Sequence, residues 1–357
     1  MRKILLAIHI PVALGLLVTG YAPYLDPRTY GMMALAGYAF PVFLILAVLS
    51  LAMATLTCKK HLIIPVAALI AAYKPVTLYI PYHSTQEVPE GAITVMSYNT
   101  HSWGTSGDGT HTADDGQTVI RYIADSNADI VCLQESYIGG TVKPYLDSIL
   151  NAAYGHHDMI KGSQDAQVTL YSRFPITRKQ RIEYESKGNI SAAFWLDING
   201  KEVIVINNHL ETTGLSIEER NRFSDMMHGK NDTIHTISRT IFGKLLEATR
   251  IRVPQAKAVA AFISEHRHDN GGTPIIVCGD FNDIPHSYVY NTIAKNLTDC
   301  YRNTATGPGY SFSHYGMRVR IDNVLCTPDI TPYNFKVDHS IAMSDHYPII
   351  GQLLLPQ

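Results

Sequence analysis

The sequence predicts a mixed α/β globular domain that follows an apolar, helical N-terminal region. Residues 1–80 are mostly apolar and carry few charges, whereas the rest of the 357-residue chain has the composition of a soluble protein. Short apolar runs in that remainder, such as 275–278, have the length of buried strands. Other stretches, such as 115–126, carry apolar residues at helical spacing, with Val119, Ile120 and Ile123 on one face. The length of the chain suggests one large domain or two smaller ones.

Three apolar runs near the N-terminus indicate transmembrane helices, because about 20 apolar residues cross a bilayer. They cover residues 4–22, 31–57 and 62–80. The third is the weakest, since Lys74-Pro75 interrupts it, so the rival arrangement is two spans and an interfacial segment. A cleaved signal peptide is disfavoured, because residues 21–24 offer no small-residue cleavage site and further apolar runs follow. We therefore expect residues 1–80 to form a membrane anchor.

The distribution of positive charge orients these spans. Arg2 and Lys3 precede the first run, and Lys59 and Lys60 lie between the second and the third. The positive-inside rule then assigns both places to the cytoplasm. With three spans, everything from residue 81 onward lies outside the cytoplasm; with two, it lies inside. We expect a multi-pass protein of the cell membrane whose large domain is extracytoplasmic.

A short linker at 81–92 separates the anchor from a domain at 93–357. The linker contains two prolines with Ser, Thr, Gln and Gly. Beyond residue 90 the chain has 23 basic and 28 acidic residues, which gives a net charge of −5. Proteins held on nucleic acid by general electrostatics usually have the opposite sign. The balance argues weakly against DNA or RNA as the main substrate, although a local basic groove would be compatible with it.

Polar side chains follow the apolar run Ile275–Cys278. Gly279 allows the backbone to turn, and Asp280 and Asn282 come next, two residues apart. In extended backbone, residues two apart point the same way. A carboxylate and an amide would then share one edge of a sheet. The alternative is a loop in which both residues merely cap a turn.

Five further polar motifs stand at the ends of predicted strands. In chain order they are Ser97-Tyr98-Asn99-Thr100, Leu133-Gln134-Glu135-Ser136, Asn207-Asn208-His209-Leu210, Arg320-Ile321-Asp322-Asn323 and Ser344-Asp345-His346-Tyr347. Together with Gly279-Asp280-Phe281-Asn282, and in this order, they resemble the endonuclease/exonuclease/phosphatase superfamily, which has the DNase I-like fold. The resemblance covers about residues 92–355. It implies a four-layer α/β sandwich, in which two mainly antiparallel sheets pack face to face and helices flank them.

Glu135 and Asp345 are candidate metal ligands. Their carboxylates are hard oxygen donors at strand ends, which suits Mg²⁺ or Mn²⁺. The resemblance makes Glu135 the principal ligand, with Asn99 and Asp345 nearby. A lone acidic residue is more often simply solvated, but Glu135 directly follows a buried apolar run. The expected cofactor is therefore Mg²⁺ or Mn²⁺.

The remaining candidates supply acid–base chemistry and phosphate binding. A carboxylate on one ring nitrogen of a histidine raises basicity at the other, so Asp322 is a possible partner for His346. The resemblance gives this pair the role of general base for the attacking water. It gives Asp280 a role at the leaving group, as acid or through water. It also makes His209 and Asn282 hydrogen-bond partners of the scissile phosphate.

Other elements follow from local patterns. Strands are expected near 168–172, 190–198, 203–208, 274–279, 318–326 and 347–354, and a helix near 254–266. Ser216 and Glu219 have capping-box spacing, which predicts a helix start. After it, an apolar stripe includes Ile241 and Leu245 and either packs on the sandwich or forms a lid or bilayer-facing surface. Cys300 and Cys326 would be able to pair in an extracytoplasmic domain if their Cα atoms are close.

These observations favour a metal-dependent hydrolase of phosphoester bonds, tethered to a membrane. The substrate is a phosphodiester, either nucleic acid or a lipid head group, and we weigh a nuclease and a sphingomyelinase-like lipid phosphodiesterase about equally. The Trp-Cys-Asp-Arg signature of inositol-polyphosphate phosphatases is absent, since residues 317–322 read Met-Arg-Val-Arg-Ile-Asp. A second alternative is a non-catalytic, membrane-tethered binding module. Nothing in the sequence indicates a protein partner.

Overall fold

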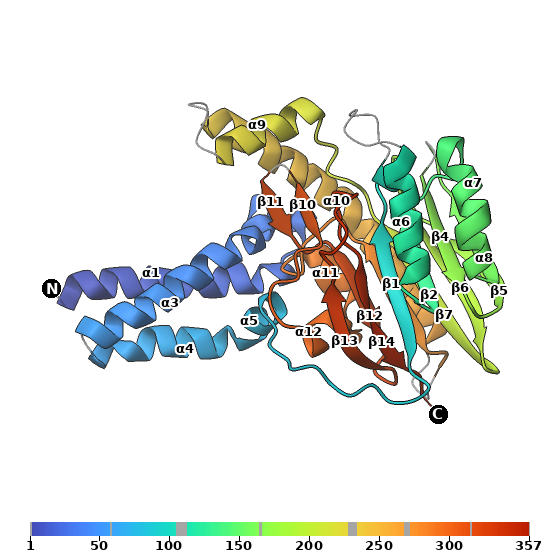
Figure 1. The fold of residues 1–357 in the computed structure, drawn as a ribbon. Helices are drawn as coiled ribbons and strands as arrows, with labels where there is room; N and C mark the ends of the chain where they lie inside the picture. The colour runs from blue at the N-terminus through green and yellow to red at the C-terminus, as the bar shows by residue number, and fades with distance from the viewer. Residues whose placement is uncertain are drawn as a thin grey trace.

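The protein combines a bundle of N-terminal helices with a layered α/β domain. The computed structural model describes residues 2–57, 59–104, 113–163, 166–227, 234–267, 272–314 and 316–356. We call residues 2–79 the N-terminal helical module. Its helices project side by side from one side of the α/β domain, and the N-terminus lies at the far end (Figure 1). Its elements are α1 (Arg2–Tyr21), α2 (Pro27–Tyr30), the 3-10 segment Gly31–Ala39, α3 (Phe40–Thr57), α4 (Ile63–Ala71) and α5 (Tyr73–Tyr79).

Two stretches of this module are long and apolar enough to cross a membrane, namely Leu5–Tyr24 and Pro27–Thr57. A third qualifies only if Lys59–Ala71 and Tyr73–Tyr79 count as one span, because their axes differ by 63°. The bend between the two helices lies near Pro75, whose backbone nitrogen has no hydrogen to donate. Length and composition therefore support two or three spans in the described part of the module.

Two six-stranded sheets form the α/β domain. The first has the order β13-β14-β1-β2-β4-β3 and the second the order β5-β6-β7-β8-β12-β9. The first sheet consists of β1 (Ile93–Asn99), β2 (Ile130–Gln134), β3 (His156–Lys161), β4 (Gln167–Ser172), β13 (Thr331–Val337) and β14 (Ile349–Leu354). The second consists of β5 (Ile176–Ile182), β6 (Ser191–Ile198), β7 (Lys201–His209), β8 (Ile275–Asp280), β9 (Thr298–Asp299) and β12 (Asp322–Cys326). Among the described strands of these sheets, only the pairs β1–β2 and β7–β8 are parallel, so the predicted mainly antiparallel sandwich is confirmed.

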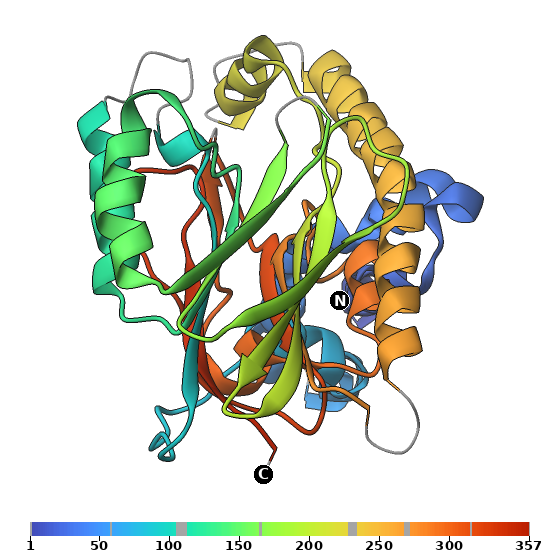
Figure 2. The ribbon, with the colours of Figure 1, turned by 90° about the vertical axis from the view of Figure 1, so that its right-hand side faces the viewer.

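Helices cover both outer faces of the sheets (Figure 2). The first sheet is covered by α6 (Ala113–Asp125), α7 (Lys143–Tyr145) and α8 (Asn151–Ala153). The second is covered by α10 (Ile234–His266) and α11 (Tyr288–Ile293). The remaining elements are α9 (Ile217–Met227), α12 (Cys300–Thr304) and the hairpin of β10 (Phe312–His314) and β11 (Met317–Val319). The predicted helix at 115–126 is confirmed, and Val119, Ile120 and Ile123 are buried on the first sheet.

The core between the sheets follows from strand periodicity. Val95 of β1 and Val205 of β7 are buried there, whereas the neighbouring Met96 and Ile204 are buried under the outer helices. Because alternate side chains of a strand point to opposite faces, strands covered on both faces are apolar throughout. The four-layer arrangement therefore explains why the runs before the polar motifs contain almost no polar residue.

Two local expectations need correction. The expected helix at 254–266 is the second half of the 33-residue α10, which continues through Pro254. The expected strand at 318–326 is divided into β11 and β12, because the chain changes from hairpin to sheet around Ile321. The sequence leaves the pairing of Cys300 and Cys326 open, and in the structure they are buried free thiols whose sulfurs lie 3.6 Å apart. The capping box is confirmed, since Ser216 Oγ accepts from Glu219 N and the Glu219 carboxylate accepts from Ser216 N.

The N-terminal helical module is docked directly on the α/β domain. Phe40 stacks on His286 with ring centroids 4.2 Å apart, and the His286 Nε2 lies 3.1 Å from the carbonyl oxygen of Pro75. Gly37 passes so close that a Cβ there would lie 1.9 Å from the His286 carbonyl oxygen. The Tyr38 hydroxyl donates to Asp283 over 2.7 Å. The module therefore contacts the chain immediately after the Asp280–Asn282 motif.

Candidate active site

The strand register brings the polar motifs to one end of the sandwich. In the first sheet, Asn99 pairs with Gln134, and Glu135 follows directly. In the second sheet, Asp280 lies opposite both His209 on β7 and Asp322 on β12. Because parallel strands end at the same edge of a sheet, these side chains converge. Gly279 makes this possible, since its φ of +122° and its approach to the Asn208 carbonyl leave no space for a Cβ.

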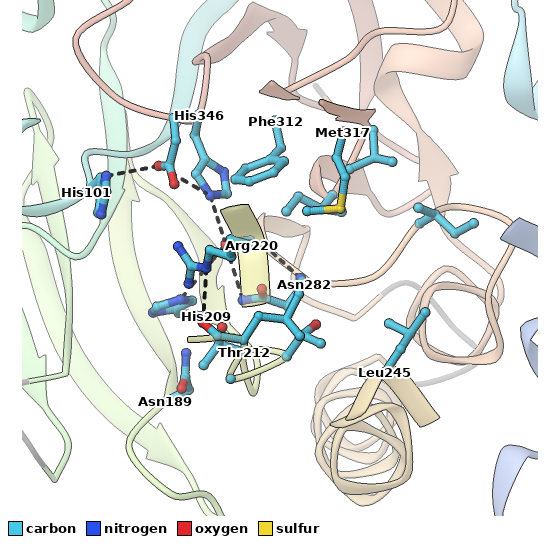
Figure 3. Close-up of a pocket in the computed structure, with 18 of the residues that line it drawn as sticks. His101, Asn189, His209, Thr212, Arg220, Leu245, Asn282, Phe312, Met317 and His346 are labelled. Atoms are coloured by element: carbon cyan, nitrogen blue, oxygen red, sulfur yellow. Dashed lines mark hydrogen bonds and ion pairs between the residues drawn. The ribbon is translucent and has the colours of Figure 1, made fainter. Parts of the chain in front are cut away.

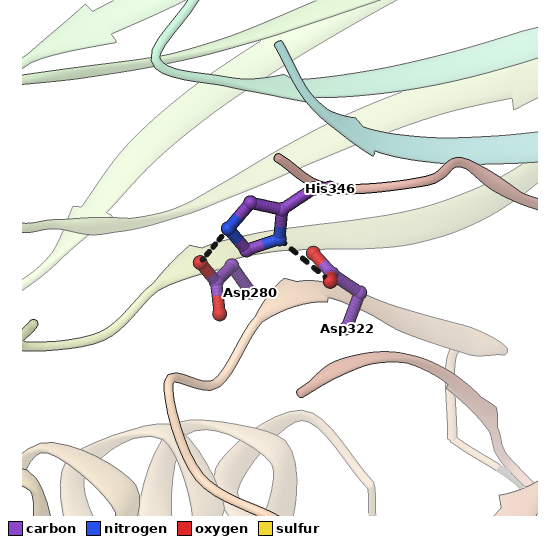
Figure 4. A group of neighbouring side chains, drawn as sticks. All are labelled: Asp280, Asp322 and His346. Carbon is purple, nitrogen blue, oxygen red and sulfur yellow. Dashed lines mark hydrogen bonds and ion pairs between the residues drawn. The ribbon is translucent and has the colours of Figure 1, made fainter. Parts of the chain in front are cut away.

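His346 and Asp322 form a buried pair (Figure 4). The imidazole Nδ1 lies 2.8 Å from the Asp322 Oδ2, so an N–H at this nitrogen donates to the carboxylate. The second ring nitrogen, Nε2, faces the Asp280 Oδ2 at 3.7 Å. Burial alone would lower the pKa of His346, but the charges of Asp322 and Asp280 outweigh it and raise the pKa well above its usual value. The pair is therefore arranged to accept and hold a proton on Nε2.

Asp280 accepts hydrogen bonds from several residues of the site. Its Oδ1 accepts from the Asn282 N–H over 2.7 Å, and its Oδ2 accepts from the Asn99 side-chain amide over 3.1 Å. Burial, followed by the charge of Asp322, raises the pKa of Asp280 to about 6. A raised pKa suits a carboxyl that donates a proton.

Glu135 presents its carboxylate to the cavity beside His209. The His209 Nε2 lies 3.4 Å from the Glu135 Oε1, and the Asn99 amide donates to the same oxygen over 3.2 Å. The Glu135 side chain keeps 35% of its surface exposed. Its φ is +51°, a conformation that non-glycine residues rarely adopt. This turn directs the carboxylate out of the strand and toward Asp280.

His101 is a site residue to which sequence reasoning gave no direct role. Its Nδ1 lies 3.2 Å from the Asp345 Oδ1, and its backbone N–H donates to the Asn99 Oδ1 over 3.1 Å. His101 comes two positions after Asn99, the last residue of β1. This nearness to the Ser97–Thr100 motif is the only sign in the sequence that His101 belongs to the site. His101 thus fixes Asp345 and orients the Asn99 side chain.

A metal would meet hard oxygen donors at this end of the sandwich. The Asn99 amide nitrogen faces both Glu135 and Asp280, so those two carboxylates lie around one point, and the Asp345 Oδ1 lies 4.0 Å from the His346 Nε2. Ligand atoms of Asp280, Asp322 and His346 also lie within 4.8 Å of one another. The 2.8 Å bond to Asp322 already occupies the His346 Nδ1, so these three residues are better described as an acid–base group. The oxygen-rich set around Glu135 fits Mg²⁺ or Mn²⁺.

The site opens into a cavity of about 1180 Å³ (Figure 3). His101, His209 and His346 gather on one side of it, and Asn282 faces them. The lining also includes polar side chains that the sequence analysis did not single out, namely Asn189, Thr212 and Arg220. Arg220 enters from α9 and binds the Leu215 carbonyl over 3.1 Å. A substrate phosphate in this cavity would therefore be able to reach several donors besides His209 and Asn282.

A model of the endonuclease/exonuclease/phosphatase family matches residues 96–346, which is most of the chain. The protein belongs to this family. A second family model, of a domain of unknown function, matches residues 2–79. A search of curated proteins finds no match. The family domain and the N-terminal helical module are thus recognised separately, and only the first carries a described chemistry.

Solved structures of the endonuclease/exonuclease/phosphatase family share the fold. The human nocturnin catalytic domain is 17% identical, with a TM-score of 0.53 over 74% of this chain and 94% of its own. A family member from Beutenbergia cavernae has the same identity and TM-score over 74% and 72%. D. rerio TDP2, solved with a single-stranded DNA product, is 17% identical, with a TM-score of 0.51 over 74% and 100%. At this identity the likeness supports the fold alone.

The structure brings all eight predicted site residues of this family member into one cluster. They are Asn99, Glu135, His209, Asp280, Asn282, Asp322, Asp345 and His346. Their individual roles stay predictions. Asn99 acts as a metal ligand only if its amide rotates, because its oxygen now accepts from His101. Arg173 lies outside this cluster, because it pairs with Asp129 at the end of β2 that is away from Glu135.

Proposed function

We propose that this protein is a divalent-metal-dependent hydrolase of phosphoester bonds that its N-terminal helical module holds at a membrane. The observation that carries the proposal is the His346–Asp322 pair, whose imidazole faces Asp280 in the lining of the cavity. A protonatable imidazole, a carboxyl whose pKa is raised to about 6 and a partly exposed carboxylate at Glu135 are the groups that hydrolysis requires.

The reaction proceeds by addition of water to phosphorus. The water oxygen forms a new P–O bond, and its proton passes to the His346 Nε2 while Asp322 stabilises the resulting imidazolium. The P–O bond to the leaving group breaks, and the leaving oxygen takes a proton from Asp280, directly or through water. His209 and Asn282 donate hydrogen bonds to the phosphate oxygens, where negative charge accumulates in the transition state.

Glu135, with Asp345 beside it, would hold the Mg²⁺ or Mn²⁺ ion. Members of this family generally depend on a divalent metal, and the oxygen donors converging here fit one. When bound, the ion supplies positive charge that neutralises the phosphate oxygens and lowers the pKa of nearby groups. This effect matters for His346, whose pKa is held above its usual value by the carboxylates.

Two features support a multi-pass topology with the catalytic domain outside the cytoplasm. Arg2 and Lys3 begin α1, and Lys59 and Lys60 follow α3. Both groups are at the end of the helical bundle that lies away from the α/β domain (Figure 1). The positive-inside rule assigns that end to the cytoplasm. Three crossings, of which the bent pair α4–α5 is the last, then lead to the extracytoplasmic side.

A nuclease remains the second candidate. D. rerio TDP2, which shares the fold, has been solved with a single-stranded DNA product. The net charge of −5 beyond residue 90 disfavours a long nucleic-acid contact. The third reading, a binding module without activity, would not require the complete set of acid, base and phosphate-binding groups found here.

The proposal is tested with the purified full chain in detergent micelles and Mg²⁺. The substrates are bis-p-nitrophenyl phosphate, single-stranded DNA and RNA, each with the wild type and the His346→Ala variant. We expect the wild type to release p-nitrophenolate and the variant to lose at least about 100-fold in kcat, because its general base is gone. His157→Ala is the matched control, since this exposed histidine stacks on Tyr171 and does not line the cavity.

Hydrolysis of none of these substrates by the wild type would count against catalysis and favour the binding module. Equal activity of wild type and His346→Ala would reject the mechanism but not the hydrolase. A preference for DNA or RNA over the small diester would establish the nuclease.

A further inference from the structure

The cavity is larger and more apolar than hydrolysis at its polar side requires. Pockets for small ligands usually measure about 300–1,000 Å³, and this one reaches about 1180 Å³. Away from the catalytic groups, hydrocarbon and aromatic side chains dominate the lining, including Tyr38, Phe223, Ile241, Phe242, Leu245 and Met317. In Figure 3, Leu245 lies on the far side of Asn282 from the imidazoles of His209 and His346. The cavity therefore has a polar side and an apolar side.

Part of the apolar side belongs to the N-terminal helical module. Tyr38 and Pro41 line the cavity where the 3-10 segment passes into α3, within the candidate span Pro27–Thr57. Tyr79, the last residue of α5, lines it as well. Tyr38 is fixed in this position by its bond to Asp283. A molecule that fills the cavity thus contacts residues of a candidate transmembrane helix.

The other part of the apolar side is α10. Ile241 and Leu245 stand one helical turn apart and line the cavity, and Phe242 lines it while keeping 43% of its surface exposed. The helix contacts α2 and the 3-10 segment of the module. The same cavity is thus lined by α10 and by the candidate span Pro27–Thr57.

The charge of the lining disfavours nucleic acid. Among the described lining residues, Arg220 and Arg318 are the only Lys or Arg side chains, whereas Glu135, Asp280 and Asp345 contribute three carboxylates. A groove that binds single strands combines stacking aromatics with a basic track along the backbone. The aromatic residues are present here, but the basic track is not. A hydrocarbon chain requires only the apolar wall.

We propose that the substrate of this site is a membrane lipid phosphoester. Its phosphate lies on the polar side among Glu135, His209 and His346, and its hydrocarbon chain lies along the wall of Tyr38, Ile241, Phe242 and Leu245. The chain enters from the bilayer between α10 and the start of α3. The inference rests on the proposed phosphoester hydrolase function and names its substrate class.

The test compares two synthetic phosphodiesters with one leaving group. Methyl and hexadecyl p-nitrophenyl phosphate both release p-nitrophenolate, so a difference in rate reports the alkyl chain. Both are given to the full chain in detergent micelles with Mg²⁺, and single-stranded DNA is a third substrate. We expect kcat/KM to be at least about 100-fold higher for the hexadecyl ester, the effect of burying a few methylenes.

Two leucines of α10 separate binding in the cavity from simple partitioning into the micelle. Leu245→Asn should reduce the hexadecyl-to-methyl ratio of kcat/KM by about 10-fold, because a polar side chain then faces the alkyl chain. Leu246→Asn changes the next residue, which is also half-buried but is not part of the lining. It should keep the wild-type ratio.

Each outcome either supports or overturns the proposal of a lipid substrate. Equal kcat/KM for the two esters, or faster hydrolysis of DNA than of the hexadecyl ester, would overturn the lipid substrate and leave the hydrolase standing. Equal loss of the ratio in both leucine variants would overturn the assignment of the chain to this wall. Hydrolysis of none of the three substrates would remove the proposed function and the inference with it. A second pair, phosphatidic acid and phosphatidylglycerol in nanodiscs, then distinguishes a monoester from a diester lipid.

Discussion

His286 should make the catalytic domain less stable as the pH falls below about 6.5. It lies at the junction with the N-terminal helical module, buried against Phe40, with its Nε2 near the Pro75 carbonyl. Burial, reinforced by the charges of Arg320 and Arg302, lowers the pKa of His286 to about 3. Unfolding would expose the ring to water and return its pKa to about 6.5.

The direction in which pH changes the folding stability follows from proton binding. Between pH 6.5 and about 3, the unfolded state carries the proton and the folded state does not, so the stabilisation present above pH 6.5 is lost as the pH falls. Each unit of pKa difference corresponds to about 1.4 kcal/mol. The expected loss is about 2 kcal/mol at pH 5 and at most about 5 kcal/mol below pH 3. His346 acts in the opposite sense, because its pKa is raised.

Comparison with His286→Gln isolates this contribution from that of His346. The assay is urea unfolding of the full chain in detergent micelles at pH 7 and pH 5, followed by the fluorescence of Trp103 and Trp195, which both belong to the catalytic domain. The wild type should lose about 2 kcal/mol more than the variant between the two pH values. An equal change in both proteins would refute the argument that the docked module keeps His286 neutral.

Further outcomes test the site itself. Asp322→Asn should lower kcat by about 10²- to 10⁴-fold while circular dichroism stays unchanged, since the imidazolium loses its counter-charge; full activity would contradict the His346–Asp322 pair. EDTA should abolish hydrolysis and Mg²⁺ or Mn²⁺ restore it, and Glu135→Gln should raise the metal concentration needed for half-maximal rate; activity indifferent to chelator would reject a metal. Gly279→Ala should destabilise the fold by at least about 3 kcal/mol, because its Cβ would lie 2.0 Å from the Asn208 carbonyl oxygen; an unchanged urea midpoint would show that the strand end relaxes freely.

The structure brings the predicted site residues together where a polar motif stands at the end of a buried strand. Asn99, Glu135 and Asp280 each stand at such a point, and strand register brings them together. The expectation was weaker for irregular segments. The strand predicted at 318–326 runs across the break near Ile321. The pattern of apolar residues continues there, although the backbone leaves the hairpin. His101 lacked any periodic signal and was given no role.

By itself the sequence determined the apolar N-terminal helices, the mixed α/β domain and the order of the six polar motifs. These depend on local composition and on the periods of helix and strand, which neighbouring residues establish. Only the tertiary structure decided which groups meet: His346 with Asp322 across 24 positions, and Tyr38 with Asp283 across 245. It also decided that residues of a candidate span and of α10 line the catalytic cavity. Such contacts depend on register and on the packing of distant surfaces, which no local pattern encodes.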